Sequence, residues 1–172
     1  MLELLTIQQM NKENTIFNLT FIPTNMVSAW KRTSLSSNFC ALILSHIENK
    51  SLENTFSTLF NELLELCVKF GENKDSPYNL AFNKSKKESE ITLKLYLKPT
   101  QVKQLKVLIN ASSKKNFIEN INEKFFTTEF AELGVSVYNF TQLFNGKINL
   151  HDKPYKGNLE TEIQLTINKE TL

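Results

Sequence analysis

Residues Leu52 to Phe70 read LENTFSTLFNELLELCVKF, and this stretch decides the fold of the chain. Its apolar residues recur at steps of three and four, a spacing that places them on one face of an α-helix. They are Leu52, Phe56, Leu59, Leu63, Leu66 and Phe70. Gly71 follows, at the position where many helices end on a residue in the left-handed conformation. The spacing therefore predicts an amphipathic helix over Leu52–Phe70 with a left-handed cap at Gly71.

Strands are predicted on both sides of this helix. Thr15–Ile22 carries β-branched and aromatic residues in loose alternation and ends at Pro23. Tyr78–Asn83 and Glu90–Lys98 alternate clearly, and the polar segment KSKKES between them predicts a hairpin turn. A further helix, capped by serine and asparagine, is expected over Ser36–His46.

The second half of the chain adds two helices and a hairpin. Pro99 suits a first helical turn, and Thr100–Asn110 keeps helical spacing. Glu129–Phe144 carries a second apolar stripe, formed by Phe130, Leu133, Val137, Phe140 and Phe144. The chain then predicts strands over Lys147–Leu150 and Leu159–Asn168, joined by a turn over Asp152–Gly157.

This order of elements predicts an α/β (α+β) two-layer sandwich, with helices on one face of a mostly antiparallel sheet. No internal repeat and no Pro/Gly/Ser-rich linker divides the 172 residues, so we expect a single domain over residues 1–172. Residues 1–13 are a candidate flexible terminus. Residues 112–128, rich in lysine and asparagine, are an insert that is either a lid or a segment packed into a pocket.

Charge and composition argue against several functions. The formal net charge is only +2, and Arg32 is the only arginine, which disfavours nucleic-acid and anionic-membrane binding. Abundant Asn, Lys, Ile and Phe suggest a low-GC bacterial genome. No apolar run reaches the roughly 20 residues of a membrane span, and the N-terminus lacks the features of a signal peptide. We therefore expect a cytoplasmic protein.

The cysteines and histidines do not form a metal site in the sequence. Cys40 and Cys67 lie far apart in apolar runs, and this pattern favours two reduced, buried thiols. His46 and His151 have no companion ligand at a suitable spacing. No metal-binding residue is assigned.

Residues Asn61 to Gly71 read NELLELCVKFG, which resembles the N-box helix of the histidine-kinase-like (GHKL) ATPases, usually close to NELLENAVKFG. The order of elements also resembles that superfamily. Within it, the chain is similar to the small bacterial SiaB-like proteins, which are serine/threonine protein kinases that act beside a regulatory phosphoprotein. The shared features are the AWKR segment around Trp30, the N-box helix, the YNLAFN strand and a late helix with a glycine. The resemblance covers most of the chain from about Trp30 onward, and it implies the histidine-kinase-like ATPase fold.

The resemblance implies roles for four residues of the N-box helix. Glu62 occupies the position of the catalytic acid, and Lys69 that of the family's lysine; Asn61 and Glu65 are further candidate nucleotide-binding residues. The asparagine that holds Mg²⁺ in the family falls on Leu66, whose side chain has no oxygen. Glu65 would be the substitute, but it points about 100° round the helix from residue 66. A simpler interpretation is that Leu66 is core and that Glu65 and Lys69 form an i,i+4 surface pair worth roughly 0.2–0.5 kcal/mol.

Two other family motifs depart from the pattern. The adenine-reading Asp-x-Gly-x-Gly loop has no counterpart after Lys98. The phosphate-binding glycine turn corresponds to residues 130–134, where Leu133 and Gly134 match but Glu132 replaces a glycine. A carboxylate there would repel phosphate. Alternatively, the helix runs through this segment uninterrupted, and Gly134 serves close packing.

Three functions follow from these residues. We favour a noncatalytic or weakly nucleotide-binding signalling or scaffold domain with a degenerate ATP site, which acts through a regulatory protein and to which no cofactor is assigned. The second is an active SiaB-like serine/threonine kinase that uses ATP and Mg²⁺, with Glu62 as general base and Leu133 and Gly134 in the phosphate turn. The third and weakest is a nucleic-acid-associated domain that uses the lysine clusters. A homo-oligomer is compatible with all three.

Overall fold

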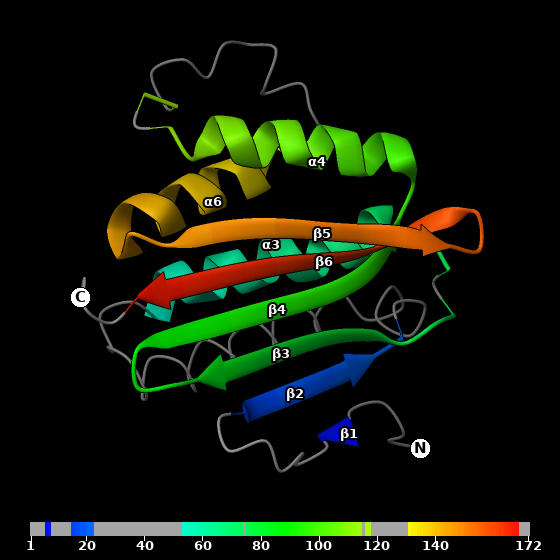
Figure 1. Ribbon diagram of the computed structural model, residues 1–172, viewed down its shortest axis with the longest axis horizontal. Coiled ribbons are helices and arrows are strands. Elements are labelled where there is room, and N and C mark those ends of the chain that lie inside the picture. Colours follow the sequence, from blue (N-terminus) through cyan, green and yellow to red (C-terminus); the bar gives the residue numbers. More distant parts are fainter. Residues whose placement is uncertain are drawn as a thin grey trace.

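The computed structural model describes residues 6–7, 15–22, 53–73, 75–114, 116–117 and 131–168 (Figure 1). The strands and helices in this part of the chain are β1 (Thr6–Ile7), β2 (Thr15–Phe21), α3 (Glu53–Phe70), β3 (Tyr78–Lys84), β4 (Glu88–Leu97), α4 (Pro99–Ser112), α6 (Ala131–Phe144), β5 (Lys147–Tyr155) and β6 (Asn158–Asn168). The predicted helix over Ser36–His46 and the residues Trp30, Cys40 and His46 lie outside the described residues, as do residues 115 and 118–128 of the insert.

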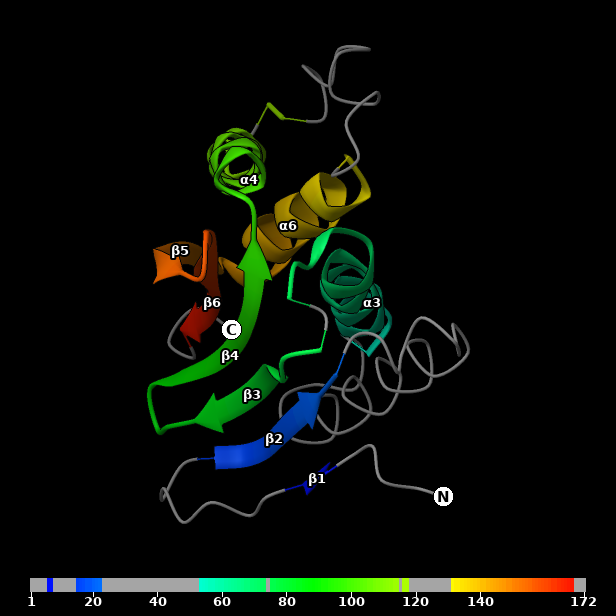
Figure 2. The ribbon, with the colours of Figure 1, turned by 90° about the vertical axis from the view of Figure 1, so that its right-hand side faces the viewer.

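The strands form one six-stranded sheet in the order β1-β2-β3-β4-β6-β5, and every neighbouring pair is antiparallel. β4 and β6 lie side by side over their length, from Glu88 opposite Asn168 to Leu97 opposite Leu159. α3 and α6 lie on one face of the sheet, and α4 packs beside α6 and next to β5 and β6 (Figure 2). This arrangement confirms the predicted two-layer α+β fold.

The core lies between the sheet and the helices. Alternate residues of β4 point into it, and Leu93, Leu95 and Leu97 are fully buried because successive side chains of a strand point to opposite faces. Of the predicted helical stripe, Leu59, Leu63 and Leu66 of α3 are buried and Phe70 is half-buried. Leu133, Val137 and Phe140 of α6, and Val102, Leu105, Leu108 and Ile109 of α4, complete this core.

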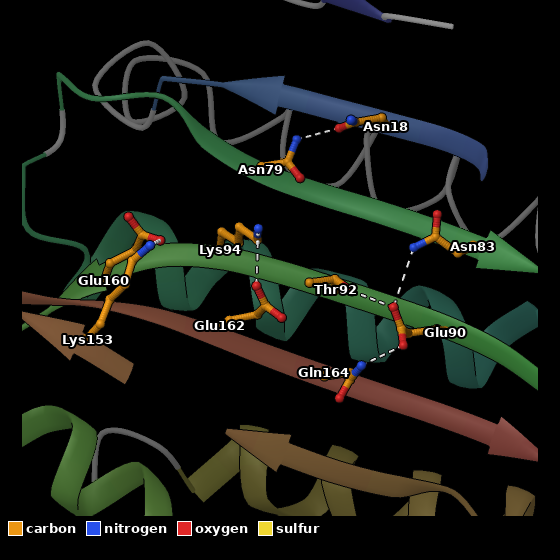
Figure 3. A network of polar contacts seen from close by, with 10 residues as sticks. All are labelled: Asn18, Asn79, Asn83, Glu90, Thr92, Lys94, Lys153, Glu160, Glu162 and Gln164. Carbon is orange, nitrogen blue, oxygen red and sulfur yellow. Dashed lines mark hydrogen bonds and ion pairs between the residues drawn. The ribbon is translucent and has the colours of Figure 1, made fainter. Parts of the chain in front are cut away.

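The opposite face of the sheet is polar, and its side chains bond to one another (Figure 3). Glu90 on β4 lies at the centre. It accepts hydrogen bonds from Thr92 Oγ1 at 3.1 Å, from Asn83 Nδ2 at 3.5 Å and from Gln164 Nε2 at 2.5 Å. Towards the other end of the sheet, Lys94 pairs with Glu162 at 3.2 Å. This face therefore satisfies its polar groups across neighbouring strands.

Two predicted turns differ from the structure. Gly71 does not adopt the left-handed conformation. Among the glycines of the described residues, Gly157 is the one with a positive φ. A side chain at Gly71 would instead overlap the carbonyl oxygen of Cys67 and the hydroxyl of Tyr78, so close approach requires glycine there.

The closing hairpin is longer than predicted. β5 continues through the segment Asp152–Tyr155, which the sequence assigns to a turn, and the turn itself is only Lys156 and Gly157. These two residues have φ values of 46° and 81°, as a type I′ hairpin turn requires. Pro154 is tolerated inside β5 because β5 is an edge strand.

Candidate functional site

Three glutamates meet where α3 packs against α6. Glu62 and Glu65 are three residues apart on α3 and so share a face of that helix. Glu132 lies in the first turn of α6. One carboxylate oxygen from each of the three lies within 4.8 Å of the other two. We call Glu62, Glu65 and Glu132 the carboxylate cluster.

The carboxylate cluster changes the chemistry of Glu62. Burial of its side chain, followed by the nearby charges of Glu65 and Glu132, raises the pKa of Glu62 to about 7. Lys69 and a hydrogen bond with Asn61 act in the opposite direction but do not cancel these effects. Glu62 therefore exchanges its proton near neutral pH, whereas an ordinary glutamate is fully ionised there.

Glu65 holds the polar residues of the cluster together. Its carboxylate pairs with Lys69 Nζ at 2.7 Å, the i,i+4 pair that the sequence predicts. It also accepts a hydrogen bond from Asn61 Nδ2 at 2.9 Å. The pairing with Glu65 raises the pKa of Lys69. Among the described residues, Lys69 is the lysine beside the cluster, and it is already engaged by a carboxylate.

The structure separates the predicted site residues into two groups. Asn61, Glu62, Glu65 and Lys69 come together in the carboxylate cluster and its surroundings. Leu66 and Leu133 are instead buried in the core, with 2% and 4% of their surface exposed.

Gly134 also belongs to the packing. A side chain at this position would lie 2.8 Å from Leu108 Cδ1 and 3.2 Å from Phe117 Cζ. α6 is continuous from Ala131 through Gly134, so these residues form helix and no glycine turn. The predicted alternative of a packing glycine in an uninterrupted helix agrees with this geometry.

Glu132 is the residue whose position in the site the sequence did not reveal. In the sequence it is notable only because it replaces a glycine of the family's phosphate-binding turn. Its proximity to Glu62 depends on the packing of α6 against α3, two helices distant in the chain, and no local pattern encodes that contact.

A nucleotide bound through Mg²⁺ does not fit this arrangement as the resemblance would place it. The metal-holding position is the buried Leu66, and the phosphate turn is replaced by helix with Glu132 in its first turn. Carboxylate oxygens are the ligand type that Mg²⁺ prefers, but anionic phosphates beside three carboxylates would meet repulsion. The side chains of the cluster suit a proton or a cationic group better than a triphosphate.

No protein-family model matches the chain, and no curated protein matches it. Among solved structures, a chain of the crystal structure of the SiaB–SiaC complex from Pseudomonas aeruginosa is similar to it. The TM-score is 0.55 at 9% sequence identity, over 84% of this chain and 97% of that chain. The two chains share a fold. In the described part of the protein, no helix is long and apolar enough to span a membrane.

Proposed function

We propose that this chain is a signalling domain that acts by binding a regulatory protein partner and that has lost magnesium-dependent nucleotide chemistry. The observation that carries the proposal is the carboxylate cluster. Three acidic side chains, together with Lys69, which is already paired with Glu65, lie where the resemblance predicts a phosphate site.

The fold supports the partner-binding half of this proposal. The similar solved chain comes from a complex of two proteins, SiaB and SiaC. A domain with the same fold and with a site unsuited to phosphates can keep protein binding and lose catalysis, because function depends on the site and not on the fold.

Calorimetry and thermal shift with Mg-ATP test the loss of nucleotide binding. A ligand that binds the folded state raises the free energy of unfolding by RT ln(1 + [L]/Kd) and so raises Tm. We expect calorimetry to detect no binding of micromolar affinity, and we expect no rise in Tm at millimolar Mg-ATP. Micromolar Mg-ATP binding would contradict the proposal.

A second experiment tests partner binding. Partners captured from cells of the source organism would be purified and mixed with the chain, and a stable complex on size-exclusion chromatography is expected without nucleotide.

A second candidate function is an active SiaB-like serine/threonine kinase. One observation favours it: the pKa of Glu62 is raised to about 7, close to the value that suits a general base at neutral pH. Phosphotransfer to the purified partner would be compared between wild type and Glu62→Gln, with Glu88→Gln as a control carboxylate on β4. A kinase that uses Glu62 loses at least 100-fold in rate only in Glu62→Gln.

A further inference from the structure

We infer that the free edge of β5 binds an extended, acidic segment of the partner protein, which adds to the sheet as a further strand next to β5. This inference rests on the proposed partner-binding function and specifies the surface and the kind of segment that binds. Its evidence is the backbone of β5 and the charges around it.

The backbone of β5 offers unused hydrogen-bonding groups. Tyr155 and Asn158 flank the two-residue turn, so they form a doubly hydrogen-bonded pair, and every second residue of β5 from Tyr155 also bonds to β6. The intervening residues Ile148, Leu150 and Asp152 direct their N–H and C=O groups to the other side, away from β6. Within the described part of the chain, the backbone hydrogen bonds outside the helices and sheet involve none of these groups.

This edge is long enough to receive a strand. β5 spans nine residues and ends the sheet, whereas β1 at the opposite end spans two. Figure 1 shows β5 running across the molecule beside α4. Exposed edges of this length are templates for pairing with another chain unless they are blocked. Pro154 removes one donor near the turn, but the donors of Ile148, Leu150 and Asp152 remain.

Lysines surround this edge from two elements. Lys147 and Lys153 lie on β5 and are exposed. Lys103 and Lys106 are exposed on α4, three residues apart and so on one face, and α4 contains no acidic residue. Lys106 pairs with Asp152 of β5, so this face of α4 lies at the edge of β5.

Among the residues that the structure describes, the acidic side chains on β5 and on the part of β6 opposite it are all in ion pairs, including Glu162 with Lys94. Asp152 is engaged by Lys106, and Glu160 of the neighbouring β6 pairs with Lys153 at 2.9 Å. Lys106 and Lys153 are engaged in these pairs, so Lys103 and Lys147, for which the described residues show no ion pair, are the charges from which an incoming acidic segment would gain. A second copy of the chain is a poorer partner: an antiparallel pairing centred on Leu150 would set Lys147 opposite Lys153 on each side of the centre, and opposed like charges are destabilising.

The two faces of β5 also define the pattern of the segment. Ile148 and Leu150 are partly buried and pack against the core on the helix side. Lys147 and Lys153 alternate with them and point to the outer face of the sheet. A strand added to β5 therefore fits best when apolar residues face the helix side and acidic residues face the outer side.

A fluorescein-labelled peptide that alternates glutamate and valine over seven residues, with glutamate at both ends, is the probe. We expect saturable binding to the wild-type protein in fluorescence anisotropy and at least a tenfold loss when lysine replaces each glutamate. In antiparallel pairing, the valines lie opposite Ile148, Leu150 and Asp152 and share their hydrogen bonds. N-methylation of the valine amides should therefore abolish binding, while N-methylation of the glutamate amides at non-terminal positions preserves it. Equal binding of both methylated peptides, or no binding of the unmodified peptide, would overturn the inference.

Variants of the protein give a second test. Leu150→Pro removes a free donor without touching a bond to β6, and Leu150→Ala is its control because it shortens the side chain but keeps the N–H. We expect at least a tenfold weaker affinity for Leu150→Pro and a smaller loss for Leu150→Ala. Lys147→Glu should weaken binding three- to tenfold, and Lys86→Glu, in the turn between β3 and β4, should leave it unchanged.

These results also separate the inference from the proposed function. If Leu150→Pro and Lys147→Glu bind the purified partner as tightly as wild type does, the partner binds elsewhere and only the inference about β5 fails. If no complex with any partner forms and Mg-ATP binds instead, the proposed function fails. The methylated peptides are tested on unmodified protein, so their outcome stands even if Leu150→Pro does not fold.

Discussion

Glu62 binds its proton more tightly in the folded protein than in the unfolded chain, and stability must depend on that difference. Its pKa rises from 4.5 to about 7 on folding. Between these two values the folded state holds the proton and the unfolded state has released it, so the free energy of unfolding falls as pH rises through this window. Below pH 4.5 both states are protonated and Glu62 makes no difference; above pH 7 the full penalty of its ionisation remains.

Glu62→Gln should therefore stabilise the protein at pH 8 and leave its stability unchanged at pH 4. We expect a gain of about 1 to 2 kcal/mol at pH 8, a value reduced to allow for the partial contact of Glu62 with water. Urea denaturation at the two pH values measures it. Glu88→Gln, at an exposed position, is the control and should show no such pH dependence. An equal effect of Glu62→Gln at both pH values would show that the pKa of Glu62 is not raised.

Gly71 and Gly157 are required for different physical reasons, and alanine at each position distinguishes them. Alanine at Gly71 would overlap the Cys67 carbonyl oxygen, a backbone atom that cannot move away cheaply. Alanine at Gly157 meets no atom within 4 Å but must adopt a φ of 81°. We expect Gly71→Ala to lower the free energy of unfolding by about 2 to 3 kcal/mol and Gly157→Ala by about 1 kcal/mol. Denaturant titration measures both, and the reverse order would contradict the close approach at Gly71.

Helices and strands with a strong hydrophobic pattern could be predicted from the sequence. α3 begins within one residue of the predicted helix and ends where predicted, because Leu59, Leu63 and Leu66 recur at helical spacing and are buried in the core. The end of β5 could not be predicted in the same way. Asp152, Lys153 and Pro154 are exposed, because an edge strand buries few side chains. Its sequence therefore lacks the apolar alternation by which a strand is predicted.

The carboxylate cluster shows the same limit for the site. Asn61, Glu62, Glu65 and Lys69 lie on one helix, so their proximity follows from helical spacing. Glu132 joins them only through the packing of α6 on α3. Helical periodicity places Leu133 and Val137 in the core, but it does not say which helix lies next to the turn that carries Glu132.

The attachment of α3 to the sheet can be measured through Cys67. Its side chain is fully buried, its Sγ donates a hydrogen bond to the carbonyl oxygen of Leu63 at 3.2 Å, and burial raises the pKa of the thiol. In Cys40→Ser protein, where Cys67 is the single thiol, we expect labelling by a thiol reagent at pH 8 to be at least 1,000-fold slower than labelling of the unfolded chain. Urea below the unfolding transition should accelerate it. Rapid labelling in native buffer would mean that α3 detaches readily from the core.

The protection of backbone amides from hydrogen exchange should be highest in the centre of the sheet and lowest at its β5 edge. β4 lies between β3 and β6, and its pairing with β6 joins the two halves of the chain. The amides of alternate β4 residues, such as Leu93, bond to β6 and exchange only when the β4–β6 pairing separates, whereas the amides on the free side of β5 have no backbone partner in the described part of the chain.

Hydrogen exchange followed by NMR tests this picture residue by residue. We expect the amides of Leu93 and Ile163 to exchange only through global unfolding. Along β5, the amides of Asn149 and His151 should be protected, and those of Ile148 and Leu150 should exchange at least tenfold faster. Uniform protection along β5 would contradict the hydrogen-bonding register deduced from the two-residue turn.

Pro154 and the turn that follows it also set a length for whatever binds to β5. The donors on the free side of β5 run from Ile148 to Asp152, a span of about 14 Å at roughly 3.4 Å per residue. Pro154 has no N–H, and the chain turns away after Tyr155, so a bound strand gains no further bond from a β5 N–H group beyond that point. A segment of about five residues already uses these N–H donors, and a longer one adds only the carbonyl of Pro154 and charge contacts near Lys147 and Lys153. The β5 edge would therefore favour the binding of short peptide motifs over that of long strands. This preference disfavours growth of the sheet into fibres.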